Sequence, residues 1–163
     1  MAGQVSDGQA AFRLRPGGVG DAGFLDRMAP RLAAQGHLPW HDDATILAFQ
    51  RAYIAEALQE ARKDGLYLVA EDPDGKAIGL ALACAAKDEI SGEPAGMLRI
   101  LVVDEAQEGR GVAHGLMLEV EGWARGRGYR LLLLDVFAAN GRAQEFYGRR
   151  GFKPDFLRLI AEI

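Results

Sequence analysis

Two glycines that precede an amphipathic segment are the residues of this sequence best suited to binding an anion. Gly109 and Gly111 follow a nearly all-apolar run, 97–103, and precede apolar residues at helical spacing, including Val112 and Leu116. A helix N-terminus carries backbone N–H groups without intrahelical partners and the positive end of the helix dipole. Because glycine has no side chain, a phosphate can approach such a backbone closely. The pattern predicts either a phosphate or pyrophosphate site or simply a tight turn into a helix.

Other motifs that bind phosphate, activate a nucleophile or hold a metal do not match the chain. The dinucleotide-binding pattern requires a small residue where His114 stands, and no Gly-Lys-Ser/Thr follows the glycines. No Gly-x-Ser-x-Gly segment is present, which favours direct transfer over a covalent intermediate. The three histidines lack ligand spacing and Cys84 is the one cysteine, so we expect no metal site.

A second group of chemically useful residues begins at Asn140, at a predicted junction between a strand and a helix. Asn is a favourable helix N-cap, which is a purely structural role. Phe146 and Tyr147 follow it on the predicted helix. Adjacent helical residues point about 100° apart, so we expect only one of these two side chains to face the deep core. Phe146 costs less to bury, which leaves the phenol of Tyr147 for a cleft.

Together these segments resemble the core of the GCN5-related N-acetyltransferase (GNAT) superfamily. The acyl-CoA signature of that family is Gln/Arg-x-x-Gly-x-Gly/Ala, and residues 108–113 (EGRGVA) match it except at Glu108. The second family motif, with Asn, Ala, an aromatic-Tyr pair and Gly-Phe, is present in residues 140–152 (NGRAQEFYGRRGF). The match is close over residues 100–152, and the earlier elements fit the family order in outline.

The resemblance implies an acetyl-CoA-dependent N-acetyltransferase whose acceptor is a primary amine on a small molecule, a peptide N-terminus or a lysine. The pantetheine arm would pair as an added strand with the backbone of Leu101, Val102 and Val103. Glu108 departs from the family pattern, and a carboxylate beside a pyrophosphate would weaken CoA binding unless it points outward or Arg110 compensates. The other expected cofactor-binding residues are Gly109, Arg110, Gly111, Val112, Ala113, His114, Asn140, Ala143 and Tyr147.

The resemblance also implies catalytic roles for two residues. Tyr147 would be the general acid that protonates the departing CoA thiolate. Asp135, on the predicted strand 130–136, stands where some relatives carry a carboxylate that activates the amine; a local cap or ion pair is the alternative role. Other carboxylates near the expected acceptor side are Glu71, Asp88, Glu89 and Glu93. Because the base and Glu108 are unsettled, a non-catalytic acyl-CoA-binding regulatory module is the alternative function.

Two further groups of side chains adjoin these motifs. In the family, the loop between the first two helices borders the acceptor pocket, and here that loop contains His37, Trp40 and His41. An ordinary loop anchored by its Trp is the alternative. A basic cluster around the last helix either meets the phosphates of CoA or is a solvated helix face; it consists of Arg142, Arg149, Arg150 and Lys153.

The elements that must position these residues form one predicted α/β domain, 11–163, after a tail at 1–10. We expect a mixed, mostly antiparallel sheet with a central splay, flanked by helices. Changes between helical and strand periodicity predict the segments. The strands are expected at 11–15, 66–70, 77–86, 97–103, 130–136 and 156–163. The first helix is expected after a cap at Asp21, with Pro30 kinking it or ending it early, and the second from a cap at Asp42 or Asp43 to a stop at Gly65. The other two helices are expected at 109–126 and 141–150.

Composition excludes several functions and sets the expected setting of the protein. With 163 residues and a net charge of −4, the chain has the length of one domain and lacks the basic character of a nucleic-acid-coating or membrane-surface protein. It has no apolar run long enough to span a membrane and no apolar signal core, so we expect a cytoplasmic location. Relatives carry two strands after the last helix, whereas only 156–163 remains here. We therefore expect a shorter sheet or a homodimer whose partner completes the edge.

Overall fold

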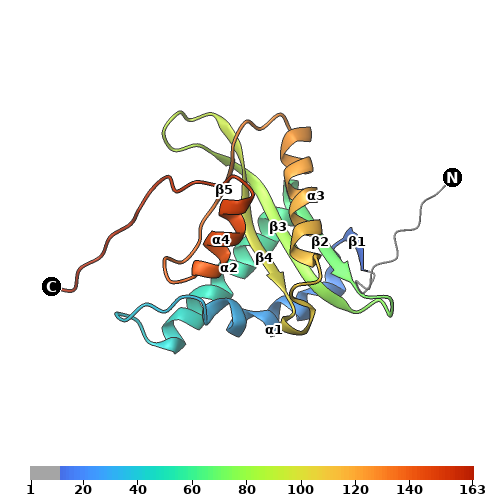
Figure 1. Ribbon diagram of the computed structural model, residues 1–163, viewed down its shortest axis with the longest axis horizontal. Helices are drawn as coiled ribbons and strands as arrows, with labels where there is room; N and C mark the ends of the chain where they lie inside the picture. The colour runs from blue at the N-terminus through green and yellow to red at the C-terminus, as the bar shows by residue number, and fades with distance from the viewer. Residues whose placement is uncertain (1–11) are drawn as a thin grey trace.

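A five-stranded sheet with the order β1-β2-β3-β4-β5 forms the centre of the computed structural model, which describes residues 12–163 (Figure 1). All neighbouring strands pair antiparallel except β4 and β5, which are parallel. This arrangement confirms the predicted mixed, mostly antiparallel sheet. The predicted tail, 1–10, and the first residue of the predicted strand 11–15 lie outside the described residues. The strands are β1 (Arg13–Pro16), β2 (Leu66–Glu71), β3 (Ala77–Lys87), β4 (Pro94–Val103) and β5 (Leu132–Leu134).

The helices of the described residues begin and end close to the expected positions. Asp42 starts the second helix by accepting a hydrogen bond from the Thr45 N–H at 2.7 Å, and Gly65 ends it. The first helix continues past Pro30 to Ala33, so an early end at the proline is wrong. Burial of Ala29 and Ala33 against the core favours the extra turn. The helices are α1 (Ala22–Ala33), α2 (Asp43–Asp64), α3 (Val112–Gly126) and α4 (Gly141–Arg149), with short 3-10 turns at Val19–Asp21 and Glu105–Gln107.

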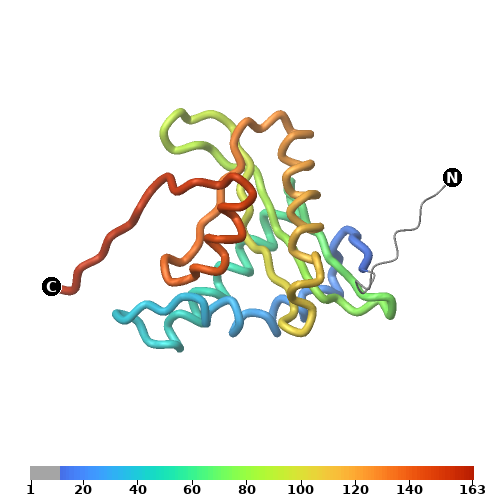
Figure 2. Tube along the Cα trace, viewed as in Figure 1, coloured from blue at the N-terminus to red at the C-terminus, as the bar shows by residue number. Residues whose placement is uncertain are grey.

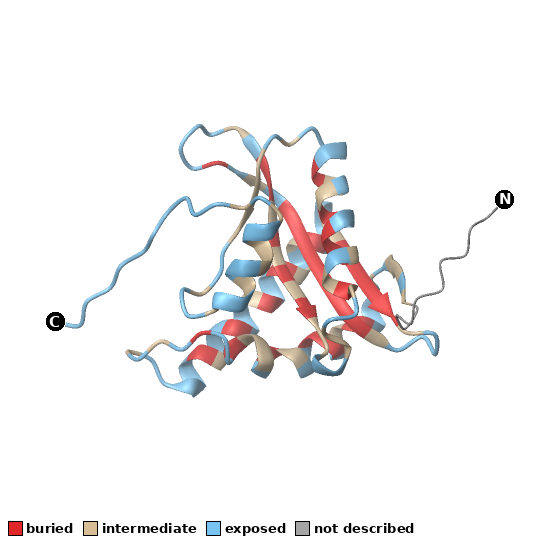
Figure 3. Ribbon diagram, viewed as in Figure 1, coloured by how far each residue is buried: buried red, intermediate tan, exposed pale blue. Residues whose placement is uncertain are grey.

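The helices form two layers, one on each face of the sheet. α1 and α2 pack on the face that carries Leu80 and Leu82 of β3. α3 and α4 pack on the face that carries Ala81 and Ala83, and they lie in front of the sheet in Figure 1. Successive strand residues point to opposite faces, so a strand covered on both sides must be apolar throughout. Figure 3 shows the resulting buried band along the central strands.

Two expectations about apolar residues are wrong. The segment 156–163 contains no strand and leads away from the sheet after α4 (Figure 2). Leu157 and Leu159 in it are 82% and 90% exposed. A strand requires a hydrogen-bonding neighbour, and β5 is only three residues long and pairs with β4 alone among the described strands. Phe49 also departs from the expectation that the apolar residues at helical spacing in 43–64, Phe49 among them, form one buried face, because its side chain is 56% exposed. None of the described helices has the length and apolar character needed to cross a membrane.

Candidate active site

The predicted splay lies between β4 and β5. The parallel pairing joins Gly96–Leu98 to Leu132–Leu134 and extends no further, although β4 continues to Val103. The predicted strand 130–136 is therefore shorter than expected. Leu101, Val102 and Val103 pair with β3 on one side and have no β-strand partner among the described residues on the other. An extended ligand can add to such an edge through backbone hydrogen bonds.

The glycine loop after β4 has the backbone conformation that an anion site requires. Gly109 has φ +73° and Gly111 has φ +80°, values that favour glycine because a Cβ would be strained there. Gly111 is the N-cap of α3, and within residues 12–163 no side chain caps that helix. The first N–H groups of α3 thus remain available as donors, and a Cβ at Gly109 would meet open space. These features fit a phosphate group.

Two arginines neutralise Glu108, the residue that departs from the family signature. Arg142 on α4 donates to Glu108 Oε2 at 2.5 Å, and Arg31 on α1 donates to Oε1. Arg31 also donates from Nε to the Val103 carbonyl at 3.2 Å, at the end of β4. Burial alone would raise the pKa of Glu108, but the hydrogen bonds and charges of Arg142 and Arg31 outweigh it and hold the pKa below its usual value. The compensating charges therefore come from these residues, whereas Arg110 is exposed and forms no ion pair with the described residues.

Asn140 and Tyr147 lie on α4 as expected, but the division between Phe146 and Tyr147 is wrong. The Asn140 side chain accepts a hydrogen bond from the Ala143 N–H at 3.1 Å, which confirms the capping role. Both aromatic side chains pack against the buried cluster of the sheet and α3, where Phe152, just after α4, also contacts the Tyr147 ring. The Tyr147 ring makes edge contacts with Phe146 and Phe152 at centroid distances of 5.3 and 5.6 Å.

The surroundings of the Tyr147 phenol keep it protonated. Burial raises the pKa of Tyr147 to about 12. No hydrogen bond joins its hydroxyl to another described residue, so burial is the one cause of the shift. A phenol in this state is a proton donor over the whole neutral pH range.

Arg99 and Tyr53 lie at the point where the splay begins, and the sequence analysis did not identify them. Arg99 is the extra residue of a β-bulge, since Leu82 pairs with Ile100 and Ala83 with Leu98. Its guanidinium donates to the Tyr53 hydroxyl at 3.1 Å and lies 4.5 Å from the centre of the Tyr53 ring. A lone charge inside an apolar strand was the signal that could have revealed it.

Two carboxylates accept hydrogen bonds from Arg99, and Asp135 lies near its partner Tyr53. Arg99 donates to Glu60 at 2.6 Å and to Glu56 at 3.3 Å. Asp135 directly follows β5 and is exposed. Burial raises the pKa of Tyr53, and the negative charge of Asp135 adds to the increase while Arg99 opposes it. Asp135 is thus close enough to influence Tyr53 electrostatically.

Three of the remaining predicted carboxylates and two residues of the predicted basic cluster have partners elsewhere. Glu71 pairs with Arg13 and Arg15, Asp88 accepts from Ser91, and Glu93 pairs with Arg130. Within the basic cluster, the structure brings only Arg142 to the glycine loop. Arg149 pairs with Glu145, and Arg150 pairs with Glu121 and contacts His114. The His114 side chain therefore faces α4.

Burial also determines the state of Cys84. This residue lies within β3, opposite Met97 of β4. Burial raises the pKa of the Cys84 thiol to about 11, which keeps it protonated at neutral pH. A protonated thiol is a poor nucleophile.

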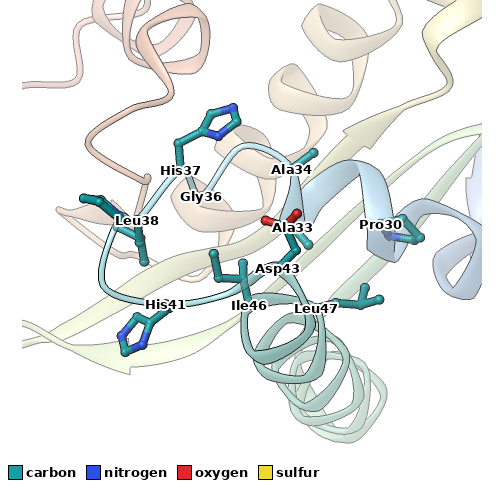
Figure 4. A pocket seen from close by; sticks show the side chains of 11 residues that line it. Pro30, Ala33, Ala34, Gly36, His37, Leu38, His41, Asp43, Ile46 and Leu47 are labelled. Atoms are coloured by element: carbon teal, nitrogen blue, oxygen red, sulfur yellow. The ribbon is translucent and has the colours of Figure 1, made fainter.

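A cavity of about 480 Å³ lies at the loop between α1 and α2 (Figure 4). His37 and His41 line it on opposite sides of the loop, with Asp43 at the start of α2 between them. Trp40 is half-buried and does not line it. The loop contacts the segment after β5, because a Cβ at Gly36 would lie 3.0 Å from the Phe137 ring. The cavity therefore adjoins the segment that carries Asp135 and Asn140.

Comparison with known proteins gives the same architecture. The model of the acetyltransferase (GNAT) family matches residues 30–152. No curated protein sequence matches the chain. A protein from Pyrococcus furiosus assigned as an acetyl transferase has a TM-score of 0.78 at 18% identity, covering 94% of this chain and 100% of that chain. A GCN5-related N-acetyltransferase from Ralstonia eutropha JMP134 has a TM-score of 0.74 at 19% identity, covering 93% and 99%.

A third similar structure contains a ligand. Aminoglycoside N-acetyltransferase AAC(6')-Iy, in complex with the bisubstrate analog CoA-S-monomethyl-acetylneamine, has a TM-score of 0.61 at 25% identity, covering 94% of this chain and 98% of that chain. The family match spans β4 and β5, which border the splay, and also the glycine loop, α3 and α4. The chain belongs to the GNAT family of acetyltransferases.

Proposed function

We propose that this protein is an acetyl-CoA-dependent N-acetyltransferase that transfers the acetyl group directly to a primary amine. The observation that carries the proposal is the end of β4–β5 pairing at Leu98 and Leu134, on the same strand that leads into the glycine loop. An unpaired strand edge suits the amide groups of pantetheine, and the N-terminus of α3 suits the pyrophosphate. Family membership and the CoA analog bound to AAC(6')-Iy support this assignment.

Acetyl-CoA contacts chiefly the backbone in this proposal. Along Leu101, Val102 and Val103, the backbone groups that point away from β3 are offered to the pantetheine at the open edge, where the Val103 carbonyl already accepts from Arg31. The pyrophosphate accepts hydrogen bonds from N–H groups at the start of α3, where the positive φ of Gly111 turns the chain. Asn140, which caps α4, retains its amide N–H₂ group for the cofactor. The remaining proposed contacts are Glu108, Gly109, Arg110, Val112, Ala113, His114, Ala143 and Tyr147.

The reaction requires one acid and one base. The neutral amine nitrogen attacks the thioester carbonyl carbon, the new C–N bond forms, and the C–S bond breaks with its electron pair going to sulfur. Tyr147 donates its phenolic proton to that sulfur, and Asp135 accepts a proton from the amine, directly or through a water. The high pKa of Cys84 supports direct transfer without an acyl-cysteine. The products are the N-acetylated amine and free CoA.

The charges near the splay favour a cationic acceptor. Glu56 and Glu60 contribute two carboxylates to the one guanidinium of Arg99, and Asp135 adds a third negative charge near Tyr53, the hydroxyl partner of Arg99. An excess of negative charge attracts an ammonium group and raises its local concentration. Similar structures include a glucosamine-6-phosphate N-acetyltransferase from Arabidopsis thaliana and aminoglycoside acetyltransferases, whose names specify amine-bearing substrates. Their substrates support an amine as the acceptor class.

Two measurements test the proposed function. Acetyl-CoA at one hundred times its Kd should stabilise the protein by about 2.7 kcal/mol, which a thermal-shift titration detects. Release of free thiol across a panel of primary amines then reports turnover. No thermal stabilisation at saturating acetyl-CoA contradicts any CoA-dependent role. Stabilisation without thiol release from any amine instead supports the alternative, a non-catalytic acyl-CoA-binding regulatory module.

A homodimer and a cytoplasmic location belong to the same proposal. The exposed apolar side chains of Leu157 and Leu159 support a segment that becomes ordered against a second copy, since apolar surface gains from being removed from water. Light scattering should then give twice the monomer mass, and Leu159→Lys should give the monomer mass. A monomeric wild-type protein at micromolar concentration contradicts the dimer.

A further inference from the structure

The pairing of Glu108 with two arginines joins helices from both layers of the fold. Arg31 comes from α1, on one face of the sheet, and Arg142 comes from α4, on the other. The carboxylate between them directly precedes the Gly109–Gly111 loop. Glu105 also lies 3.9 Å from Arg31, but its side chain is 85% exposed. Both guanidiniums thus contact the residue that comes just before the glycine loop leading into α3.

The two arginines are held to different degrees. The Arg31 side chain is 29% exposed and has a second anchor on the Val103 carbonyl. The Arg142 side chain is 72% exposed, and Glu108 is its one ion-pair partner among the described residues. An ion pair with a solvent-exposed partner contributes little net stability, so Arg142 can separate from Glu108 at small cost. Arg31 has more contacts to lose.

A phosphate is a strong competitor for the more mobile arginine. A guanidinium can form two parallel hydrogen bonds with a phosphate, and phosphate oxygens offer more acceptors than a carboxylate that already accepts from Arg31. A phosphate at the start of α3 would lie next to Glu108 and therefore close to Arg142. The carboxylate would at the same time repel the incoming ligand unless Arg31 continued to neutralise it.

We propose that Glu108 and Arg142 form an electrostatic latch at the entrance to the pyrophosphate site. In the free protein Glu108 holds Arg142, and when acyl-CoA binds, Arg142 exchanges the carboxylate for a phosphate while Arg31 keeps Glu108 in place. The latch lowers the affinity for phosphate-bearing ligands, because the ion pair must break before Arg142 can contribute. This inference rests on the proposed function. It assigns opposite effects on acyl-CoA affinity to Glu108, which lowers it, and Arg142, which raises it.

A double-mutant cycle with two ligands tests the latch. Isothermal titration at low salt measures the Kd of acetyl-CoA and of acetyl-pantetheine, which lacks phosphates, for wild type, Glu108→Gln, Arg142→Gln and the double variant. We expect Glu108→Gln to tighten acetyl-CoA about threefold to tenfold and Arg142→Gln to weaken it about tenfold or more. With Arg142→Gln already present, Glu108→Gln should change the Kd by less than about twofold. Acetyl-pantetheine should bind all four proteins equally.

A matched control and three outcomes keep the inference falsifiable. Glu145→Gln breaks the exposed Arg149–Glu145 pair on the same helix and should leave both Kd values unchanged. Weaker acetyl-CoA binding by Glu108→Gln would overturn the latch and make Glu108 a support for the loop. If Glu108→Gln raised the affinity for acetyl-CoA equally with and without Arg142, the latch would also be overturned, since the carboxylate would then only repel phosphate. If wild type binds acetyl-pantetheine but not acetyl-CoA, the latch is wrong; if it binds neither, the proposed function itself fails.

Discussion

Replacing Tyr147 with Phe removes the proposed general acid while preserving its packing. The ring contacts with Phe146 and Phe152 involve carbon atoms that Phe retains. The hydroxyl has no hydrogen-bond partner among the described residues, so its loss leaves no other described group unpaired. The free energy of unfolding should therefore change by less than about 1 kcal/mol. Tyr147→Phe thus isolates the chemical role of the phenol from its structural role.

The structure places the expected loss of rate near the lower limit for general acids. Such roles contribute roughly 100-fold to 10,000-fold, most when the pKa of the acid lies near the working pH. Burial raises the pKa of Tyr147 to about 12, well above the usual thiol value of about 8.5. Full proton transfer to an unperturbed thiolate would therefore be uphill. We expect a loss of about 100-fold in kcat, or about 2.7 kcal/mol at 1.36 kcal/mol per tenfold change.

The assay is steady-state thiol release at saturating acetyl-CoA, with kcat and KM measured from pH 6 to 10. Because a phenol of pKa about 12 is almost fully protonated throughout this range, Tyr147→Phe should lower the whole profile without shifting it. Tyr129→Phe is the matched control, since Tyr129 packs on Trp123 beside Gly96, at the far end of β4. A kcat for Tyr147→Phe within about twofold of wild type would refute the general-acid role, as would an equal loss in Tyr129→Phe.

Three further predictions concern the loop, the base and the pH dependence of stability. Gly111→Ala should lower the free energy of unfolding by about 1–2 kcal/mol and weaken acetyl-CoA binding, because Gly111 has a φ of +80°. Gly122→Ala, within α3, should instead raise the free energy of unfolding by about 0.5–1 kcal/mol. Urea unfolding in which both variants change stability in the same direction contradicts this. Asp135→Asn should lower kcat/KM about 100-fold at pH 7; a kcat/KM within about twofold of wild type assigns the proton to another acceptor. Hydrogen bonds from Arg15, followed by Arg13, hold the pKa of Glu71 below its usual value. This stabilisation is present above the unfolded pKa of about 4.3 and is lost as pH falls through the folded value. Arg15→Gln should therefore reduce the decline in urea stability below pH 5, and an identical decline in both proteins would contradict the assignment.

Most of the fold could be predicted because its signals are local. The apolar runs of β2, β3 and β4 and the stop at Gly65 each depend on residues within one element. The segment 156–163 has the same apolar composition as a strand, yet it forms none, because a strand is completed by a neighbour and not by its own residues. The strand predicted at 130–136 is shorter than expected for the same reason, because its pairing with β4 ends at Leu134.

The candidate site divides in a similar way. The resemblance to the two family motifs pointed to the glycine loop, Asn140 and Tyr147 as site residues. It did not reveal Arg31, which meets Glu108 across 77 positions of sequence, or the contact between Arg99 and Tyr53 across 46 positions. Helical spacing also predicted Phe146 and Tyr147 to divide between core and cleft, which the packing of α4 contradicts.

The sequence by itself determined where the two glycines of the candidate anion site lie, the helical periodicity next to them and the family that the motifs resemble. Those properties are local, since backbone conformation and amphipathic spacing are set by residues within a few positions of one another. Only the tertiary structure decided that two arginines from opposite faces of the sheet neutralise Glu108, and that burial raises the pKa of Tyr147. Charge pairing and desolvation depend on distances through space, and these exist only after the helices have packed on the sheet.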